Sequence, residues 1–411
     1  MTATDGAPKS VRRSDLLVIG AGVMGAWTAY HAQRASDRSV TLLDAWGPGH
    51  LRATSGDETR ITRAAHGAEV LYTRWSQLAL KQWKEFEQEH GVELFVPTGV
   101  LWFAHHESSF EAASATVLEA EGIPFEVLAP DELRHRWPAI GTDDGLRSAL
   151  YEPEAGVLMA RRGCQEITRA FREAGGAFDL AAVRPARAEG GRLLSVEDDS
   201  GASWSAESFV FACGPWLPRT FPEVLGDVIR VTKQDLVFVG PRAGDDRFSA
   251  AAMPAWADYD AAYYGVPGID DRGFKLAPDR YGPIFDPSNG ERVVDPDSVR
   301  LARAYLRRRF PDLEHAPVVE TRVCQYESTV DANFIIARHP ELENVWLVGG
   351  GSGHAYKHGP RIGQYVLARL NGAQEGDQDG PGEERFRLGT RQAGSAARTG
   401  GDDMARTWEL F

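Results

Sequence analysis

The chain has 411 residues, of which 43% are hydrophobic and 25% are charged, and its formal net charge is -14. This length is too great for one simple core, so we expect two domains. The negative charge argues against nucleic acid or an anionic membrane as the main partner, because either would repel the protein, although it does not exclude a local basic pocket.

The first part of the chain, residues 1–13, has the composition of a flexible tail. Arg12 and Arg13 raise the alternative of a twin-arginine export signal, but the apolar stretch behind them is short, is broken by glycines and fits a first strand better. No apolar run reaches the length of a membrane span, and the three cysteines are too few for a disulfide framework. We therefore expect a cytoplasmic protein. A monomer is the starting assumption, because the sequence leaves the oligomeric state open.

A strand, a glycine-rich turn, a helix and a second strand open the folded part of the chain. Leu16–Ile19 is a short apolar run, a helical stretch follows from Ala26 to about Arg34, and Val40–Leu43 is a second apolar run that ends at Asp44. This order is typical of the start of a parallel α/β sheet.

The turn, GAGVMG, fits the G-x-G-x-x-G pattern of dinucleotide-binding sites. Gly20 permits the tight turn, Gly22 lets the backbone approach a pyrophosphate, and Gly25 lets the helix pack on the strand. The helix N-terminus faces the phosphates with its partial positive charge. Asp44, 24 residues beyond Gly20, can accept hydrogen bonds from a ribose diol. The motif predicts a bound dinucleotide and does not separate NAD from FAD. The alternative is a plain glycine-rich turn.

The rest of the chain shows two further patterns. Apolar residues at helical spacing predict helices over residues 70–90, 111–121, 130–136, 164–174, 301–309 and 362–370. Apolar runs predict strands over residues 98–104, 208–212 and 344–348. Residues 228–285 alternate between polar and apolar, which indicates an antiparallel sheet in a second domain. We expect the polar segment 373–411 to be disordered, although its last residues, TWELF, could dock.

Four stretches in the right order carry a resemblance to a known family. They are GAGVMG near the N-terminus, SGDETRITRAAHG (55–67), YYGVP with the following GFKL (263–276), and VCQYESTVDANFIIARHPELENVWLVGGGSGHAYKHGP (323–360). With these stretches, most of residues 14–372 resembles the group of monomeric sarcosine oxidase and N-methyltryptophan oxidase. This group consists of flavin amine oxidases within the D-amino-acid oxidase (DAO) superfamily.

The resemblance implies an α/β fold with two domains. FAD would lie across a discontinuous Rossmann-like domain, and a second domain with a mixed or antiparallel sheet would roof the flavin and form the substrate cavity. On this basis we assign the FAD-binding domain to residues 14–90, 151–225 and 320–372. We assign the substrate domain to residues 91–150 and 226–319.

The resemblance also assigns a role to Cys324. In that family the cysteine at this position bonds through sulfur to a methyl group of the flavin ring, and Tyr326, which we include among the substrate contacts, is retained as well. A thiolate is a good nucleophile and an electron-poor ring activates its methyl group, so the chemistry fits. The alternative is a small buried hydrophobe, the role that we expect for Cys164 and Cys213. We assign further contacts with FAD to Val183, Gly351, Gly353, His354 and Lys357.

For the substrate, the resemblance implies a carboxylate held by Arg63 and Lys357, because an apolar cavity admits an anion only where cations meet it. It places Arg60 beside the flavin, where Arg60 would share a helical face with Arg63 if the segment coils. Tyr264 would edge the pocket. Lys275 would lie over the flavin ring and stabilise the anion that forms when dioxygen takes an electron. For each cation the alternative is a solvated position on the surface.

Two positions depart from the pattern of the family. Its histidines near the flavin align with Gly56 (or Ser55) and with Asp279, so sarcosine itself is in doubt as the substrate, and an acid near the substrate amine would favour a cationic or bulkier amine. His354 and His358 lie four residues apart, but the other nine of the 11 histidines are scattered, and we expect no metal site.

The sequence thus predicts an FAD-dependent amine oxidase that acts on an amino acid or a related amine, secondary or N-methylated. The amine would lose a hydride equivalent to the flavin, the imine would hydrolyse, and dioxygen would leave as hydrogen peroxide. Three alternatives stay open. They are a flavin dehydrogenase that passes electrons to a quinone or carrier protein, a non-catalytic flavoprotein, and a nicotinamide-dependent dehydrogenase in which Cys324 has no role.

Overall fold

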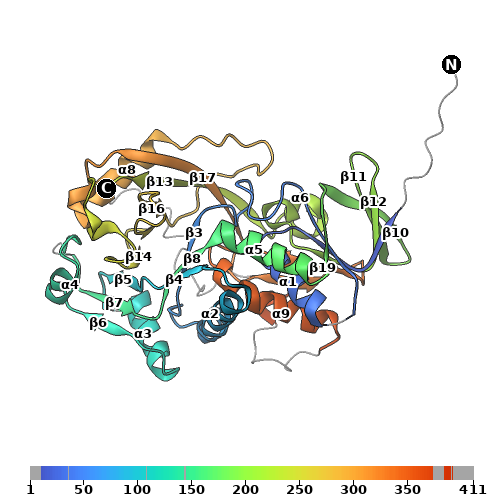
Figure 1. Ribbon diagram of the computed structural model, residues 1–411, viewed down its shortest axis with the longest axis horizontal. Helices are drawn as coiled ribbons and strands as arrows, with labels where there is room; N and C mark the ends of the chain where they lie inside the picture. The colour runs from blue at the N-terminus through green and yellow to red at the C-terminus, as the bar shows by residue number, and fades with distance from the viewer. Residues whose placement is uncertain are drawn as a thin grey trace, which may run out of the picture.

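The computed structural model contains three β-sheets, two of them large (Figure 1). It describes residues 11–35, 37–107, 109–142, 145–373, 384–389 and 391. Within these ranges no helix combines the length and the apolar character that crossing a bilayer requires.

The first sheet has a parallel centre. Its eight strands are β1 Arg12–Ile19, β2 Val40–Asp44, β9 Ala177–Leu180, β10 Val183–Glu189, β11 Arg192–Asp198, β12 Ser203–Phe211, β18 Ile335–Arg338 and β19 Val345–Gly349. The strands β19, β12, β1, β2 and β9 lie side by side in this order, and neighbours are parallel. The remaining three strands extend the sheet through antiparallel pairs. Central parallel strands are buried on both faces, which explains the continuous apolar runs of β1 and β2.

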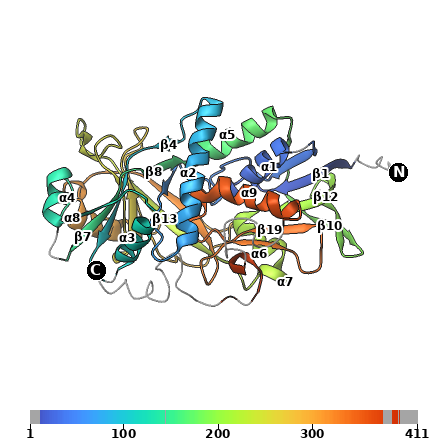
Figure 2. The same ribbon diagram turned by 90° about the horizontal axis from the view of Figure 1, so that it is seen from below.

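Helices cover both faces of this sheet. On one face lie the four helices α1 Val23–Ala35, α2 Val70–His90, α5 Ala160–Glu173 and α9 Gly359–Leu370, which share one core (Figure 2). On the other face the short helices η1 Gly214–Trp216, α6 Leu217–Thr220 and α7 Pro222–Leu225 follow β12. The bounds of α2 are those that its apolar spacing predicts. It ends where Gly91 adopts a left-handed conformation with φ of 64°.

The second sheet is mixed. Its eight strands, in spatial order, are β17 Val318–Ser328, β13 Arg230–Val239, β16 Phe274–Pro278, β15 Tyr263–Val266, β14 Ala255–Asp258, β5 Val100–Ala104, β7 Ser148–Glu152 and β6 Glu126–Leu128. Strands β14 and β5 pair in parallel, and the other neighbours are antiparallel. The helices around it are α3 Phe110–Ala120, α4 Pro130–Arg136 and α8 Pro296–Arg309, with the short turns η2 Asp246–Phe248 and η3 Pro311–Leu313. Figures 1 and 2 show α2 between this part and the first sheet.

Strand β17 belongs to the second sheet, which differs from the assignment of residues 320–328 to the FAD-binding domain. It pairs with β13 along its length, and Cys324 lies opposite Gln234. The chain crosses back to the first sheet only after Ser328. The sequence hides this crossing because one continuous motif, residues 323–360, spans both sheets.

The third sheet shows that the segment of Arg60 does not coil, so Arg60 and Arg63 do not share the helical face that a coiled segment would have given them. It consists of β3 Thr59–Thr62, β8 Gly156–Met159 and β4 Phe95–Val96, and β3 pairs antiparallel with β8. The β-branched side chains of the TRIT segment favour a strand over a helix. In a strand, residues three apart point to opposite faces, so the two arginines have different surroundings.

Residues 384–389 pack against helices α2 and α9, which corrects the expectation that this segment is disordered. The short turn η5 Glu384–Phe386 buries the ring of Phe386 against Trp75 and Tyr365, with centroid distances of 5.2 and 5.6 Å. Arg391 donates to Asp331 at 2.8 Å. The terminal TWELF and residues 1–10 lie outside the described residues.

Candidate active site

The turn after β1 meets other backbone so closely that only glycine fits at two positions. Gly20 has φ of +108°, and a Cβ there would lie 2.3 Å from the carbonyl oxygen of Ala212. A Cβ on Gly25 would lie 1.9 Å from the carbonyl oxygen of Gly20, so α1 packs directly on the turn. These contacts give the turn the geometry that a close approach to a phosphate requires, with the N-terminus of α1 behind it.

Asp44 at the end of β2 holds this turn in place. One carboxylate oxygen accepts from the backbone N–H of Ala21 at 2.8 Å, and the other accepts from Trp46 and Gly47, both at 2.8 Å. The side chain also lies on the wall of the main cavity. Asp44 thus supports the turn and faces the space in front of it.

A cavity of about 520 Å³ joins the glycine turn to the second sheet. Most residues that the sequence predicts for the site lie on its wall: Gly20, Gly22, Asp44, Arg60, Arg63, Val183, Tyr264, Cys324, Tyr326, Gly351, Gly353, His354 and Lys357. Two predicted residues, Gly25 and Lys275, lie behind the wall. The glycine loop after β19 contributes to the wall as well, and Gly353 has φ of +73° there.

Cys324 reaches the cavity from the middle of β17. Its sulfur lies 3.7 Å from a guanidinium nitrogen of Arg60 and 4.0 Å from the carbonyl oxygen of Thr54. The other two cysteines have different surroundings. Burial raises the pKa of Cys164 to about 12 and raises the pKa of Cys213 further, so both thiols stay protonated. Of the three cysteines, only Cys324 has its sulfur both on the cavity wall and beside a guanidinium group.

Asp57 is a buried carboxylate that the sequence reasoning missed. It accepts from Arg60 at 2.8 Å and from the Nζ of Lys275. Burial would raise the pKa of Asp57, but the charge of Lys275 and then that of Arg60 outweigh burial and lower this pKa to about 2. Lys275 also donates to Thr59, at 3.2 Å to the carbonyl and 3.3 Å to the hydroxyl oxygen. The available signal was the spacing of Asp57 three residues before Arg60 in SGDETR.

Arg63 and Lys357 bring two buried basic side chains to the wall of the cavity. Arg63 donates to the carbonyl of Ala65 and to the hydroxyl of Tyr259 at 3.2 Å, and its guanidinium lies 5.0 Å from the ring centroid of Trp102. Lys357 donates to the carbonyl of His354 at 2.8 Å. These partners are neutral. Burial, and then the charge of Arg63, hold the pKa of Lys357 well below its usual range. An anion in this chamber would relieve both costs.

Two tyrosines and an aspartate complete the part of the wall in the second sheet. Tyr326 in β17 donates to Asp279 at 3.4 Å, and Tyr264 in β15 lies on the same wall. Burial raises the pKa of Tyr264 to about 12 and that of Tyr326 well above its usual range, so both phenols remain hydrogen-bond donors. Asp279, where the resembling family has histidine, is buried and faces the cavity.

Glu327 is a second acid that sequence reasoning missed. It lies near the end of β17, next to the glycine loop, and one of its carboxyl oxygens has no hydrogen-bond partner among the described residues. Burial raises the pKa of Glu327 to about 8, although the backbone of Gly351 acts in the opposite direction. Near neutral pH this side chain is therefore mostly a neutral carboxylic acid. The only signal in the sequence was a charged residue within a buried strand.

Comparisons with known proteins confirm the resemblance. The family model described as FAD dependent oxidoreductase (DAO) matches residues 15–369. The chain is 29% identical over 367 residues to monomeric sarcosine oxidase of Bacillus sp. (strain B-0618), which covers 87% of this chain and 91% of that protein. It is 27% identical over 363 residues to N-methyl-L-tryptophan oxidase of Yersinia pestis (strain Pestoides F), which covers 85% of this chain and 93% of that protein.

Among solved structures, L-proline dehydrogenase from P. horikoshii has a similar fold. The TM-score is 0.77 at 19% sequence identity, and the match covers 89% of this chain and 96% of that chain. At this identity the likeness shows a shared two-domain α/β fold, as the sequence predicts.

The raised pKa of Glu327 predicts a pH effect on stability. The folded protein holds a proton on Glu327 up to about pH 8, whereas the unfolded chain releases it near the ordinary glutamate pKa of 4.5. Folding stability from this group is therefore full below pH 4.5 and is lost as the pH rises through 8. We expect Glu327→Gln to remove the effect, which is of the order of 3 kcal/mol between pH 5 and 8. Thermal unfolding of both proteins at several pH values measures it, with Glu341→Gln as an exposed control. Equal pH profiles for wild type and Glu327→Gln would contradict the assignment.

Proposed function

The chain belongs to the DAO family of FAD-dependent oxidoreductases, and from this premise we propose that it oxidises the C–N bond of an amino acid or a related amine, secondary or N-methylated. The product is an imine, which water hydrolyses, and dioxygen takes up the electrons and leaves as hydrogen peroxide. The observation that carries the proposal is the cavity in which a glycine turn, Cys324 and two buried basic side chains meet.

The wall of the cavity fits FAD in three respects. The turn at Gly20 allows a phosphate to approach the backbone, and Cys324 presents its sulfur beside a cation. In the described part of the chain, the carboxyl oxygen of Glu327 that has no hydrogen-bond partner lies near the glycine loop. A neutral carboxylic acid can donate a hydrogen bond to an acceptor on the cofactor. When bound, FAD supplies the two-electron acceptor for the C–H bond next to the substrate nitrogen.

Arg63 and Lys357 orient the substrate through its carboxylate. Both side chains are buried, and in the part of the chain that the structure describes their hydrogen bonds go to neutral groups, so a substrate carboxylate can pair with them. The burial that lowers the pKa of Lys357 is offset when an anion arrives, because a nearby negative charge favours the ammonium form. The clamp therefore gains its second charge as the substrate binds. This selects amines that carry an acidic group.

Three further residues of the wall, Arg60, Tyr264 and Asp279, present a charge or a hydrogen-bonding group to the cavity. Arg60 cannot leave the site easily, because Asp57 and the carbonyls of Thr54 and Thr59 hold it at 2.6 to 2.8 Å. Tyr264 keeps its phenol proton and can donate to the substrate. Asp279 can accept from the amine or from a cationic substituent, which agrees with a substrate other than sarcosine.

One observation favours a second candidate, a dehydrogenase that passes electrons to a quinone or a carrier protein. Lys275, which we expect to stabilise the oxygen anion, lies behind the wall and forms an ion pair with Asp57. Burial also lowers the pKa of Lys275, although Asp57 opposes this shift. A paired cation stabilises a second anion less than an unpaired one does. We still favour the oxidase, because the ammonium remains within the same buried cluster as Arg60.

The central test is anaerobic bleaching of the flavin spectrum with a panel of N-methyl, cyclic and primary amino acids. We expect bleaching by at least one secondary amino acid, followed by one hydrogen peroxide per turnover when air is admitted.

In Lys357→Met we expect kcat/KM to fall about 10- to 100-fold, because a charge-assisted hydrogen bond to the substrate carboxylate is lost. The exposed Lys81→Met serves as a matched control. A flavin that no amine bleaches would overturn the proposed activity, and bleaching without peroxide would favour the dehydrogenase.

We propose that Cys324 holds the flavin through a thioether. Formation of this bond would replace the S–H bond of the cysteine and one C–H bond of the ring methyl group by a C–S bond. The two protons and two electrons released would reduce dioxygen to hydrogen peroxide. Acid precipitation should leave the yellow colour with the wild-type pellet and release it into the supernatant from Cys324→Ser. Cys213→Ser, whose thiol lies on the same wall, should behave as wild type. Colour in the wild-type supernatant would exclude the bond.

Lys275→Met should separate the two half-reactions. If the ammonium stabilises the developing oxygen anion, reoxidation by dioxygen should slow by roughly a hundredfold or more, because a charge in a buried site contributes several kcal/mol. Anaerobic bleaching by the amine should change much less. Stopped-flow measurement of both steps gives the comparison, with Lys84→Met as a control. Equal slowing of both steps would assign Lys275 a purely structural role.

A further inference from the structure

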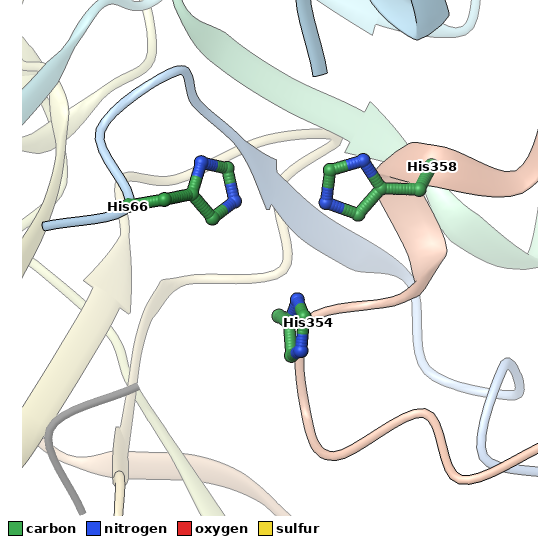
Figure 3. Close-up of side chains that lie close together, drawn as sticks. All are labelled: His66, His354 and His358. Carbon is green, nitrogen blue, oxygen red and sulfur yellow. The ribbon is translucent and has the colours of Figure 1, made fainter. Parts of the chain in front are cut away.

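Three buried histidines from two distant parts of the chain face one another behind the substrate chamber. His66 follows β3, and His354 and His358 flank Lys357 in the turn η4 Tyr356–His358 and the residues before it. Figure 3 shows the rings of His66 and His358 pointing toward each other, with His354 beside the gap between them. One nitrogen from each ring lies within 4.8 Å of the other two. The sequence indicated only the pair 354 and 358, because nothing placed residue 66 next to them.

The hydrogen bonds of the three histidines leave at least one nitrogen of each ring free to bind a metal ion. Nδ1 of His66 lies 2.8 Å from the carbonyl oxygen of Ala64, and Nε2 of His354 lies 2.9 Å from that of Ala332. A carbonyl oxygen only accepts, so these two nitrogens carry the protons, and the opposite nitrogens keep their lone pairs. Those opposite nitrogens, and both nitrogens of His358, have no hydrogen-bond partner among the described residues. A histidine that donates one N–H to a carbonyl and offers the other nitrogen is the usual state of a metal ligand.

The three rings lie in the protein interior. Each is at most 5% exposed, and the ring of Tyr72 packs against all three. In this apolar setting, the ring nitrogens that lack a hydrogen-bond partner among the described residues are costly. A bound cation would satisfy them together.

The positive charges around the three histidines weaken the binding of a metal ion, but they leave the three nitrogen ligands in place. Arg63 and Lys357 lie near enough to influence the imidazoles. The buried Glu152 accepts from the backbone N–H groups of Ala64 and Ala65 at 2.7 and 3.1 Å, so an acidic side chain lies close to the segment that carries His66. This acid, and a substrate anion held beside Lys357, would offset part of the repulsion between the two basic side chains and a divalent ion.

We propose that His66, His354 and His358 bind one divalent cation of the zinc class. Three imidazoles suit zinc and its borderline neighbours rather than calcium or magnesium, which prefer oxygen ligands. Zinc–nitrogen bonds of about 2.0–2.1 Å require the nitrogens to approach by the order of 1 Å, a change that ring rotation can supply. His354 lies on the cavity wall, so the ion can enter there. The ion would tie the segment that carries Arg63 to the turn that carries Lys357.

The test uses the full-length flavoprotein, stripped with a chelator and dialysed against Zn²⁺. We expect one zinc per chain by elemental analysis and a rise in Tm of a few degrees with Zn²⁺, since a ligand that binds only the folded state stabilises it. In His358→Phe both effects should disappear, with at least a hundredfold weaker binding. Its metal-free Tm should not fall, because this ring has no hydrogen bond to lose within the described ranges. His315→Gln, whose side chain is 90% exposed, is the matched control.

A second variant protects the test if His358→Phe does not fold. His66→Asn keeps an amide donor for the carbonyl of Ala64 and removes the Nε2 ligand. Zinc content and zinc-dependent Tm that are unchanged in the cluster variants would overturn the proposal, as would a wild-type protein that retains no zinc. These readouts do not depend on catalysis, so the proposal is separate from the amine oxidase activity.

Discussion

One buried carboxylate holds together three strands that meet at the site. Asp57 accepts from Arg60 in β3 and from Lys275 in β16, and a guanidinium nitrogen of Arg322 in β17 lies 3.7 Å from it. Buried charges are costly unless each has a partner, and removing one partner leaves the others uncompensated. The cluster therefore fixes the small sheet against the second sheet. It also sets the position of Arg60 next to Cys324, and with it the shape of the cavity.

Local patterns in the sequence predicted the parts of the site that depend on local structure. The glycine turn needs only the order of strand, turn and helix, and Gly20 and Gly25 prove irreplaceable for the steric reasons that the motif implies. Helix α2 follows from its apolar spacing because one face of it packs on the first domain. Arg63, Tyr264 and Lys357, which three separate short motifs carry, lie on one cavity wall.

Long-range pairing decided what the sequence could not predict. Strand β17 joins the second sheet because of its partner β13, some 90 residues earlier in the chain, and no local signal marks that choice. In the sequence, Asp57 cannot be told from an ordinary surface acid, because its partner Lys275 lies far away in the chain. Glu327 and His66 likewise acquire their properties from neighbours that are remote in sequence. The sequence left open whether the segment of Arg60 coils, and pairing with β8 makes it a strand.

The buried ring of Phe386 makes a polar-looking segment part of the core of the first domain. Composition alone would mark everything after α9 as dispensable. A protein cut at residue 373 would leave the faces of Trp75 and Tyr365 bare, and an apolar patch of this kind favours self-association. Anyone who shortens this protein for crystallisation should therefore keep the chain at least through Arg391, which ties the segment to Asp331.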